Sequence, residues 1–167
     1  MNIFSIISLL LSILTAISAL PKTPTTEDIK TTVSVVIETE APSPSFSYSI
    51  YEEINEYRTS LGLYPLEFNS ELSKISTVRA EEASVYWSHT RPDGRGFHTV
   101  FEDYNKFNNI AVAEILAKVG AKDAKRTVTG WINSPKHHAV LITEKYTEIG
   151  IGFYEYEGRW YIAAHTI

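Results

Sequence analysis

Apolar residues recur every three or four positions just after residue 49, which predicts one face of an amphipathic helix. They are Ile50, Ile54, Tyr57 and Leu61. Ser49 and Glu52 have the spacing of a capping box at its start. Gly62 can end the helix in a left-handed conformation.

A second helix is predicted after Asn69, an N-cap residue that precedes a new run of helical spacing. Its inward positions are Leu72, Ile75, Val78 or Arg79, Ala83 and Tyr86. The sequence Pro-Asp-Gly at residues 92–94 favours a turn. His89 is therefore expected where this helix gives way to a loop.

Shorter elements follow in the second half of the chain. The aromatic residues Phe97, Phe101, Tyr104 and Phe107 favour a short helix, whereas the apolar run 110–119 fits either a strand or a helix. Asp123 can cap a further helix, and Ser134 with Pro135 can begin another.

The C-terminal pattern predicts a β-hairpin. Apolar residues alternate over residues 149–153 and again over 160–164, and Glu157 and Gly158 lie between the two runs. Helices followed by an antiparallel hairpin indicate an α+β domain built in layers.

The N-terminal part has a different composition and predicts no core. Residues 1–19 are uncharged and mostly apolar, as in a secretory signal peptide, with a short membrane anchor as the alternative. Residues 20–48 are rich in Thr, Ser and Pro and are expected to be a linker, although Val33–Ile37 could form a strand. The folded domain is expected to span residues 49–167.

Charge and motif content exclude several classes of function. The net charge is −5, and residues 49–167 hold 13 basic and 16 acidic side chains, so no nucleic-acid partner is expected. The chain has no cysteine, which excludes disulfides, thiolate zinc sites and a cysteine nucleophile. Glycine-rich nucleotide-binding motifs are also missing from the sequence.

Several short motifs occur together in a fixed order. They are Ile-Asn-Glu-Tyr-Arg at 54–58, Ser-His-Thr-x-Pro-Asp-Gly-Arg at 88–95, Trp-x-x-Ser-Pro-x-His at 131–137 and Thr-Glu-Ile-Gly-Ile-Gly at 147–152. In this combination the chain resembles the CAP superfamily (cysteine-rich secretory proteins, antigen 5 and pathogenesis-related 1), and within it the disulfide-free SCP-like branch. The resemblance implies a three-layer α-β-α sandwich, secretion, and a central cleft with two His and two Glu.

The resemblance assigns cleft residues one by one. His89 and His137 match the two histidines, and Glu114 matches one glutamate, although Ala113 and Ile115 replace the Gly and Asn that usually flank it. The position of the second glutamate falls near Ser134.

Two imidazoles and one carboxylate can bind zinc with a water as fourth ligand, so His89 and His137 are candidate metal ligands for Zn²⁺. The alternative is an inert, hydrogen-bonded polar cluster around Glu114. Among the other histidines, His98 is expected as a surface or packing residue, His138 is expected to face solvent, and His165 lies beyond the matched motifs.

Three functions remain open at this point. The first is a secreted, non-catalytic protein that binds a small apolar ligand, a sterol or fatty acid, or an extracellular protein partner. The second is a metal-dependent hydrolase or protease that uses the same cleft. The third is a surface or antigen-like interaction module. No stable membrane insertion is expected after cleavage of the signal peptide.

Overall fold

The computed structural model describes residues 45–107 and 110–167. The predicted signal peptide and almost all of the predicted linker, with its Val33–Ile37 segment, lie outside the described residues. Within the described part, no helix is both long and apolar enough to cross a bilayer.

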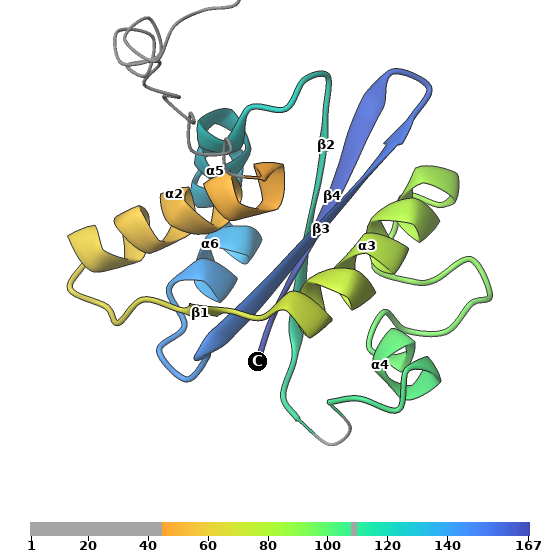
Figure 1. The fold of residues 1–167 in the computed structure, drawn as a ribbon, viewed down its shortest axis with the longest axis horizontal. Helices are drawn as coiled ribbons and strands as arrows, with labels where there is room; N and C mark the ends of the chain where they lie inside the picture. Colours follow the sequence, from red (N-terminus) through yellow and green to blue (C-terminus); the bar gives the residue numbers. More distant parts are fainter. Residues whose placement is uncertain (1–44, 108–109) are drawn as a thin grey trace, which may run out of the picture. The chain divides into compact units, whose positions relative to one another are not determined.

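The described residues form five helices and four strands (Figure 1). The helices are α2 (Phe46–Ser60), α3 (Ser70–Val85), α4 (Thr99–Asp103), α5 (Ala124–Ile132) and α6 (Pro135–Leu141). The strands are β1 (Glu67–Phe68), β2 (Ala113–Val119), β3 (Glu148–Tyr156) and β4 (Arg159–Thr166).

The strands form one sheet in the order β1-β3-β4-β2. β3 and β4 make the predicted hairpin, β2 pairs antiparallel with β4, and the short β1 pairs parallel with β3. Figure 1 shows α3 and α4 on one side of the sheet and α2, α5 and α6 on the other. The predicted three-layer α-β-α fold is therefore confirmed.

Alternation along the strands gives the sheet two different faces. The face under α2, α5 and α6 carries the larger core cluster, which includes Ile115, Ile149, Ile151, Ile162 and Trp131. The opposite face, under α3 and α4, carries small residues such as Ala163 together with buried polar side chains. The second face is therefore where polar chemistry can be built.

Two glycines of β3 let α3 lie directly on the sheet. A Cβ atom at Gly150 would come within 3.0 Å of the Leu72 backbone, and one at Gly152 within 3.0 Å of the Thr77 backbone. No side chain fits at either position, because the interior is already close-packed there. The glycines thus fix the height of α3 above the strands.

Three local expectations need correction. The first helix begins at Phe46, because Ser45 rather than Ser49 caps it and accepts a hydrogen bond from the Tyr48 nitrogen. The predicted domain start at residue 49 therefore falls inside this helix, whose Phe46 ring packs edge-on against Phe153. The ambiguous run 110–119 holds a strand, β2, and the short strand β1 was not predicted.

The outer edge of β2 is partly closed by a side chain. Among the described strands β2 pairs with β4 alone, so alternate backbone groups of β2 point away from the sheet. The Trp131 indole nitrogen donates a 3.0 Å hydrogen bond to the Leu116 carbonyl oxygen at this edge. The same buried ring also joins α5 to the core.

Candidate functional site

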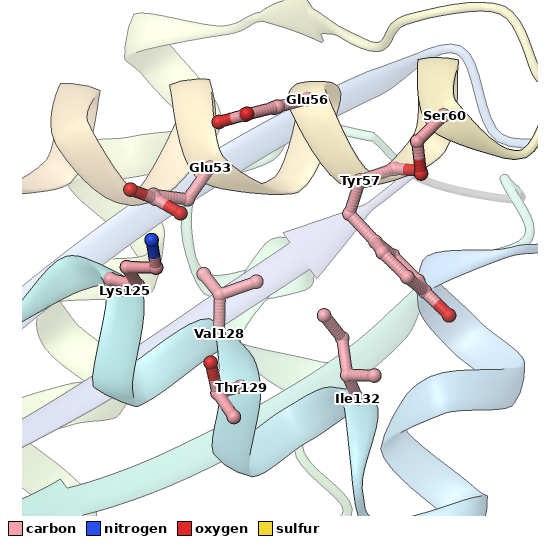
Figure 2. Close-up of a pocket in the computed structure, with 8 residues that line it drawn as sticks. All are labelled: Glu53, Glu56, Tyr57, Ser60, Lys125, Val128, Thr129 and Ile132. Carbon is pink, nitrogen blue, oxygen red and sulfur yellow. The ribbon is translucent and has the colours of Figure 1, made fainter.

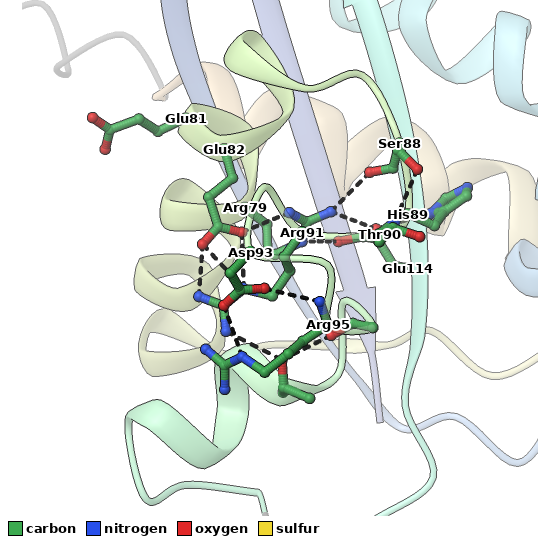
Figure 3. Close-up of polar contacts among 12 residues, drawn as sticks. Arg79, Glu81, Glu82, Ser88, His89, Thr90, Arg91, Asp93, Arg95 and Glu114 are labelled. Atoms are coloured by element: carbon green, nitrogen blue, oxygen red, sulfur yellow. Dashed lines mark hydrogen bonds and ion pairs between the residues drawn. The ribbon is translucent and has the colours of Figure 1, made fainter.

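Glu114 of β2 is the centre of a buried polar cluster on the α3 face of the sheet (Figure 3). Its side chain has no exposed surface. Arg79 donates to both carboxylate oxygens, from Nε at 2.8 Å and from Nη2 at 3.2 Å. His89 Nδ1 lies 2.9 Å from Oε1, and His165 Nε2 lies 3.1 Å from Oε2. Four donors therefore occupy the roughly four acceptor positions of one carboxylate.

These contacts keep Glu114 ionised. Burial by itself raises the pKa of a carboxyl group. Here hydrogen bonds from His165, His89 and Arg79 outweigh burial and hold the pKa of Glu114 at about 2. The side chain is thus a fixed anion at neutral pH and has no proton to donate.

His165 is a full member of the cluster, which the sequence did not reveal. It is completely buried in β4 and stands directly across from Glu114 in the strand register. Burial lowers the pKa of His165, and the attraction of Glu114 does not fully offset this. Neutral His165 therefore donates from Nε2 to the carboxylate, and its Nδ1 accepts from the Ser76 hydroxyl 2.8 Å away.

His89 differs from His165 in its access to solvent. Its side chain is 54 % exposed, although Nδ1 is directed at the buried carboxylate. A carboxylate only accepts hydrogen bonds, so His89 donates from Nδ1 and can offer Nε2 to solvent or a ligand.

His137 approaches this cluster without joining it. It is half-buried near the start of α6, and burial lowers its pKa, with a further contribution from the charge of His89. Over the described ranges, its side chain makes no hydrogen bond or ion pair. Ser134 is the N-cap residue of α6 but makes no side-chain capping bond. The predicted quartet thus contains one bonded pair, His89 and Glu114.

His138 corrects another expectation, since it is not a freely solvated side chain. It is half-buried, and its Nε2 lies 2.8 Å from the Tyr57 hydroxyl. The two rings also pack against each other, with centroids 5.8 Å apart. This pair connects α6 to α2 rather than serving the Glu114 cluster.

The described residues hold no complete set of zinc ligands. Within residues 45–107 and 110–167, no group of three or more His, Cys, Asp or Glu side chains is arranged to hold a metal. Glu114 cannot supply one of the ligands, because its acceptor positions already serve the polar cluster, and this leaves only the imidazole nitrogens of His89 and His137 among the predicted ligands. Structural and catalytic zinc sites need at least three protein ligands with free lone pairs.

The loop that carries His89 is held by a second set of charges (Figure 3). Arg91 is only 6 % exposed, donates twice to Glu82 and binds Asp103 at 2.6 Å. Arg79 also reaches Glu82, at 2.6 Å, so the loop and the Glu114 cluster share one network. Arg91 thus anchors the loop that carries His89 to α3 through Glu82 and to α4 through Asp103.

Two cavities are separate from the Glu114 carboxylate. A groove of about 260 Å³ runs between α2 and α5 (Figure 2), and its lining residues are Glu53, Glu56, Tyr57, Ser60, Lys125, Val128, Thr129 and Ile132. A second cavity of about 400 Å³ adjoins the His89 loop, with Val85, Tyr86 and Pro92 among its lining residues. Val85 and Tyr86 are 76 % and 52 % exposed, so two neighbouring apolar side chains lie open to solvent beside this cavity.

The fold and the motifs can be compared with known proteins. The family model described as "CAP: Cysteine-rich secretory protein family" matches residues 51–166. The chain belongs to this family. Since it contains no cysteine, this CAP domain is held together without disulfides.

Solved structures of CAP proteins share the fold. An outer surface protein of Borrelia burgdorferi is 27 % identical with a TM-score of 0.64, covering 72 % of this chain and 90 % of its own. An extracellular SCP-domain protein of Bacillus anthracis is 19 % identical with a TM-score of 0.65, covering 73 % of this chain and 40 % of its own. A cysteine-rich secretory protein of Staphylococcus aureus is 24 % identical with a TM-score of 0.59, covering 76 % of this chain and 40 % of its own.

The chain therefore spans less than half the length of the Bacillus and Staphylococcus proteins. Among curated proteins, no sequence matches it significantly.

Proposed function

We propose that this CAP domain is an extracellular binding protein that takes up a small apolar ligand without chemical turnover. The observation that supports it best is the saturation of Glu114 by four hydrogen bonds from Arg79, His89 and His165. A general base or a metal ligand needs a free lone pair, and this carboxylate has none to offer. The extracellular and outer-surface neighbours support an export role.

The competing proposal is a zinc-dependent hydrolase. It requires His89 and His137 to share a metal, and it can be tested directly by calorimetric zinc titration of wild type and His137→Ala. We expect no saturable binding at micromolar zinc in either protein. Tight zinc binding that disappears in His137→Ala, together with zinc-dependent peptide or ester hydrolysis, would reject the non-catalytic proposal.

The groove between α2 and α5 is the ligand site that we propose. Its floor includes Val128, which is almost fully buried, and the half-buried Ile132 and Tyr57. Pockets that enclose drug-sized ligands measure roughly 300–1,000 Å³. At about 260 Å³, the groove suits one alkyl chain better than a whole sterol.

Binding of a fluorescent long-chain alcohol, which carries no charge, tests this site. Thr129→Trp would fill the groove from α5 and is expected to weaken binding at least tenfold, because the apolar floor is no longer accessible. Arg126→Trp is the matched control, since Arg126 is also exposed on α5 but does not line the groove. An equal loss of binding in both variants, or no loss in either, would count against the groove as the ligand site.

A protein partner is the second candidate, favoured by the exposed Val85 and Tyr86 beside the 400 Å³ cavity. Exposed apolar surfaces of this kind commonly mark interaction sites. Cross-linking to a cell-surface extract should yield a defined adduct with wild type that is absent with Tyr86→Ser. An unchanged adduct in the variant would exclude this surface.

A further inference from the structure

The two sides of the α2–α5 groove carry unequal charge. α2 contributes the carboxylates of Glu53 and Glu56, whereas the only cation among the described lining residues is Lys125 of α5. Among the described residues, none of these three side chains forms an ion pair or a side-chain hydrogen bond. Their charges are therefore available to a bound molecule.

The charges are also unevenly placed along the groove. Figure 2 shows the Lys125 side chain pointing from α5 toward Glu53 on α2. Glu56 lies one turn further along α2, where the lining of α5 is the apolar Val128 and the neutral Thr129. Lys125 thus faces Glu53, and no cation of the described lining stands opposite Glu56.

We propose that the groove selects amphiphiles with a cationic head group, such as alkylamines, over amphiphiles with a carboxylate head. This inference rests on the proposed function of the groove and specifies its ligand class. The alkyl chain lies on Val128 and Ile132, and the ammonium group lies against the Glu56 carboxylate. A carboxylate head at the same place meets a like charge, which disfavours the complex.

The size of the preference follows from the exposure of Glu56. Exposed ion pairs change affinities by about two- to fivefold, and salt screens them. Attraction of the amine and repulsion of the carboxylate act in opposite directions on the two ligands. We therefore expect octylammonium to bind about tenfold more tightly than octanoate at low salt, with octanol between them.

The experiment compares octylammonium, octanol and octanoate by calorimetry or NMR titration at about pH 7, below their aggregation concentrations. Glu56→Gln is expected to remove most of the preference by weakening octylammonium about threefold and strengthening octanoate. Glu52→Gln is the matched control, because Glu52 is exposed on the same helix but does not line the groove. Lys125→Gln should widen the preference, whereas Arg126→Gln should not change it.

The outcomes separate this inference from the proposed function. Equal affinities for the three ligands, or a preference that Glu56→Gln and Glu52→Gln reduce alike, would overturn the charge selection and leave the groove as a ligand site. Binding of none of the three would overturn both. A cation preference that depends on Glu56 and falls at about 0.5 M salt is the result that supports the inference. Unchanged melting curves of these surface variants will show that folding is not the cause.

Discussion

Replacing Glu114 by Gln tests the structural role of the buried cluster. The pKa of Glu114 falls from 4.5 to about 2 on folding, a difference of about 2.5 pH units. At about 1.36 kcal/mol per unit, the ionised carboxylate contributes about 3 kcal/mol to the free energy of unfolding. Glu114→Gln also leaves Arg79 buried with one anion fewer, so we expect a loss of roughly 3–5 kcal/mol at pH 7.

The sign of the pH dependence provides the sharper test. Because the folded-state pKa is lowered, this stability is complete above about pH 4.5 and is lost as the pH falls toward 2. The free energies of urea unfolding of wild type and Glu114→Gln should therefore converge as the pH falls from 4.5 to about 2. Glu81→Gln is the matched control, since Glu81 is an exposed residue of α3 outside the cluster. The reasoning would be refuted if the stability difference between wild type and Glu114→Gln stayed constant with pH, or if Glu81→Gln produced the same difference.

Three further changes test other parts of the fold. Gly152→Ala forces a Cβ atom into α3 and should lower the free energy of urea unfolding by about 2–3 kcal/mol. At Gly130 a Cβ atom meets nothing within 4 Å, so Gly130→Ala should be neutral or stabilising. Equal effects of the two changes would contradict this packing. Arg91→Lys loses the forked bonds of a buried guanidinium, so hydrogen exchange in the 88–96 loop should accelerate, and unchanged exchange would argue against its anchoring role. Trp131→Phe removes the hydrogen bond to the Leu116 carbonyl oxygen and should lower the free energy of urea unfolding by about 1–3 kcal/mol. This loss is larger than expected for an aromatic exchange that breaks no such bond.

Much of the fold could be predicted from local patterns. Asn69 and the helical spacing after it defined α3, and alternation around Glu157 and Gly158 defined the hairpin, whose turn has positive φ at both residues. The strand β2 could not be separated from a helix, because the strand that pairs with it is distant in sequence. Its assignment depends on pairing with β4.

The site was only partly predictable for the same reason. A hydrogen-bonded cluster around Glu114 was one of the two alternatives, but His165 entered it only through the register that sets it opposite Glu114. Alternation within β4 did hold a signal, since His165 shares a face with Tyr161 and Ala163. Arg79 was ambiguous with Val78 as the inward residue of α3, and only its bonds to Glu114 settle the choice.

The bond from the Trp131 indole to the Leu116 carbonyl oxygen has a consequence for self-association. A bare strand at the border of a sheet can recruit the strand of another molecule and start a fibril. With its acceptor at mid-strand occupied and a bulky ring beside it, β2 offers foreign chains a poor template. This protection of the β2 edge matters most in a domain without covalent cross-links, because it reduces polymerisation when the domain partly unfolds.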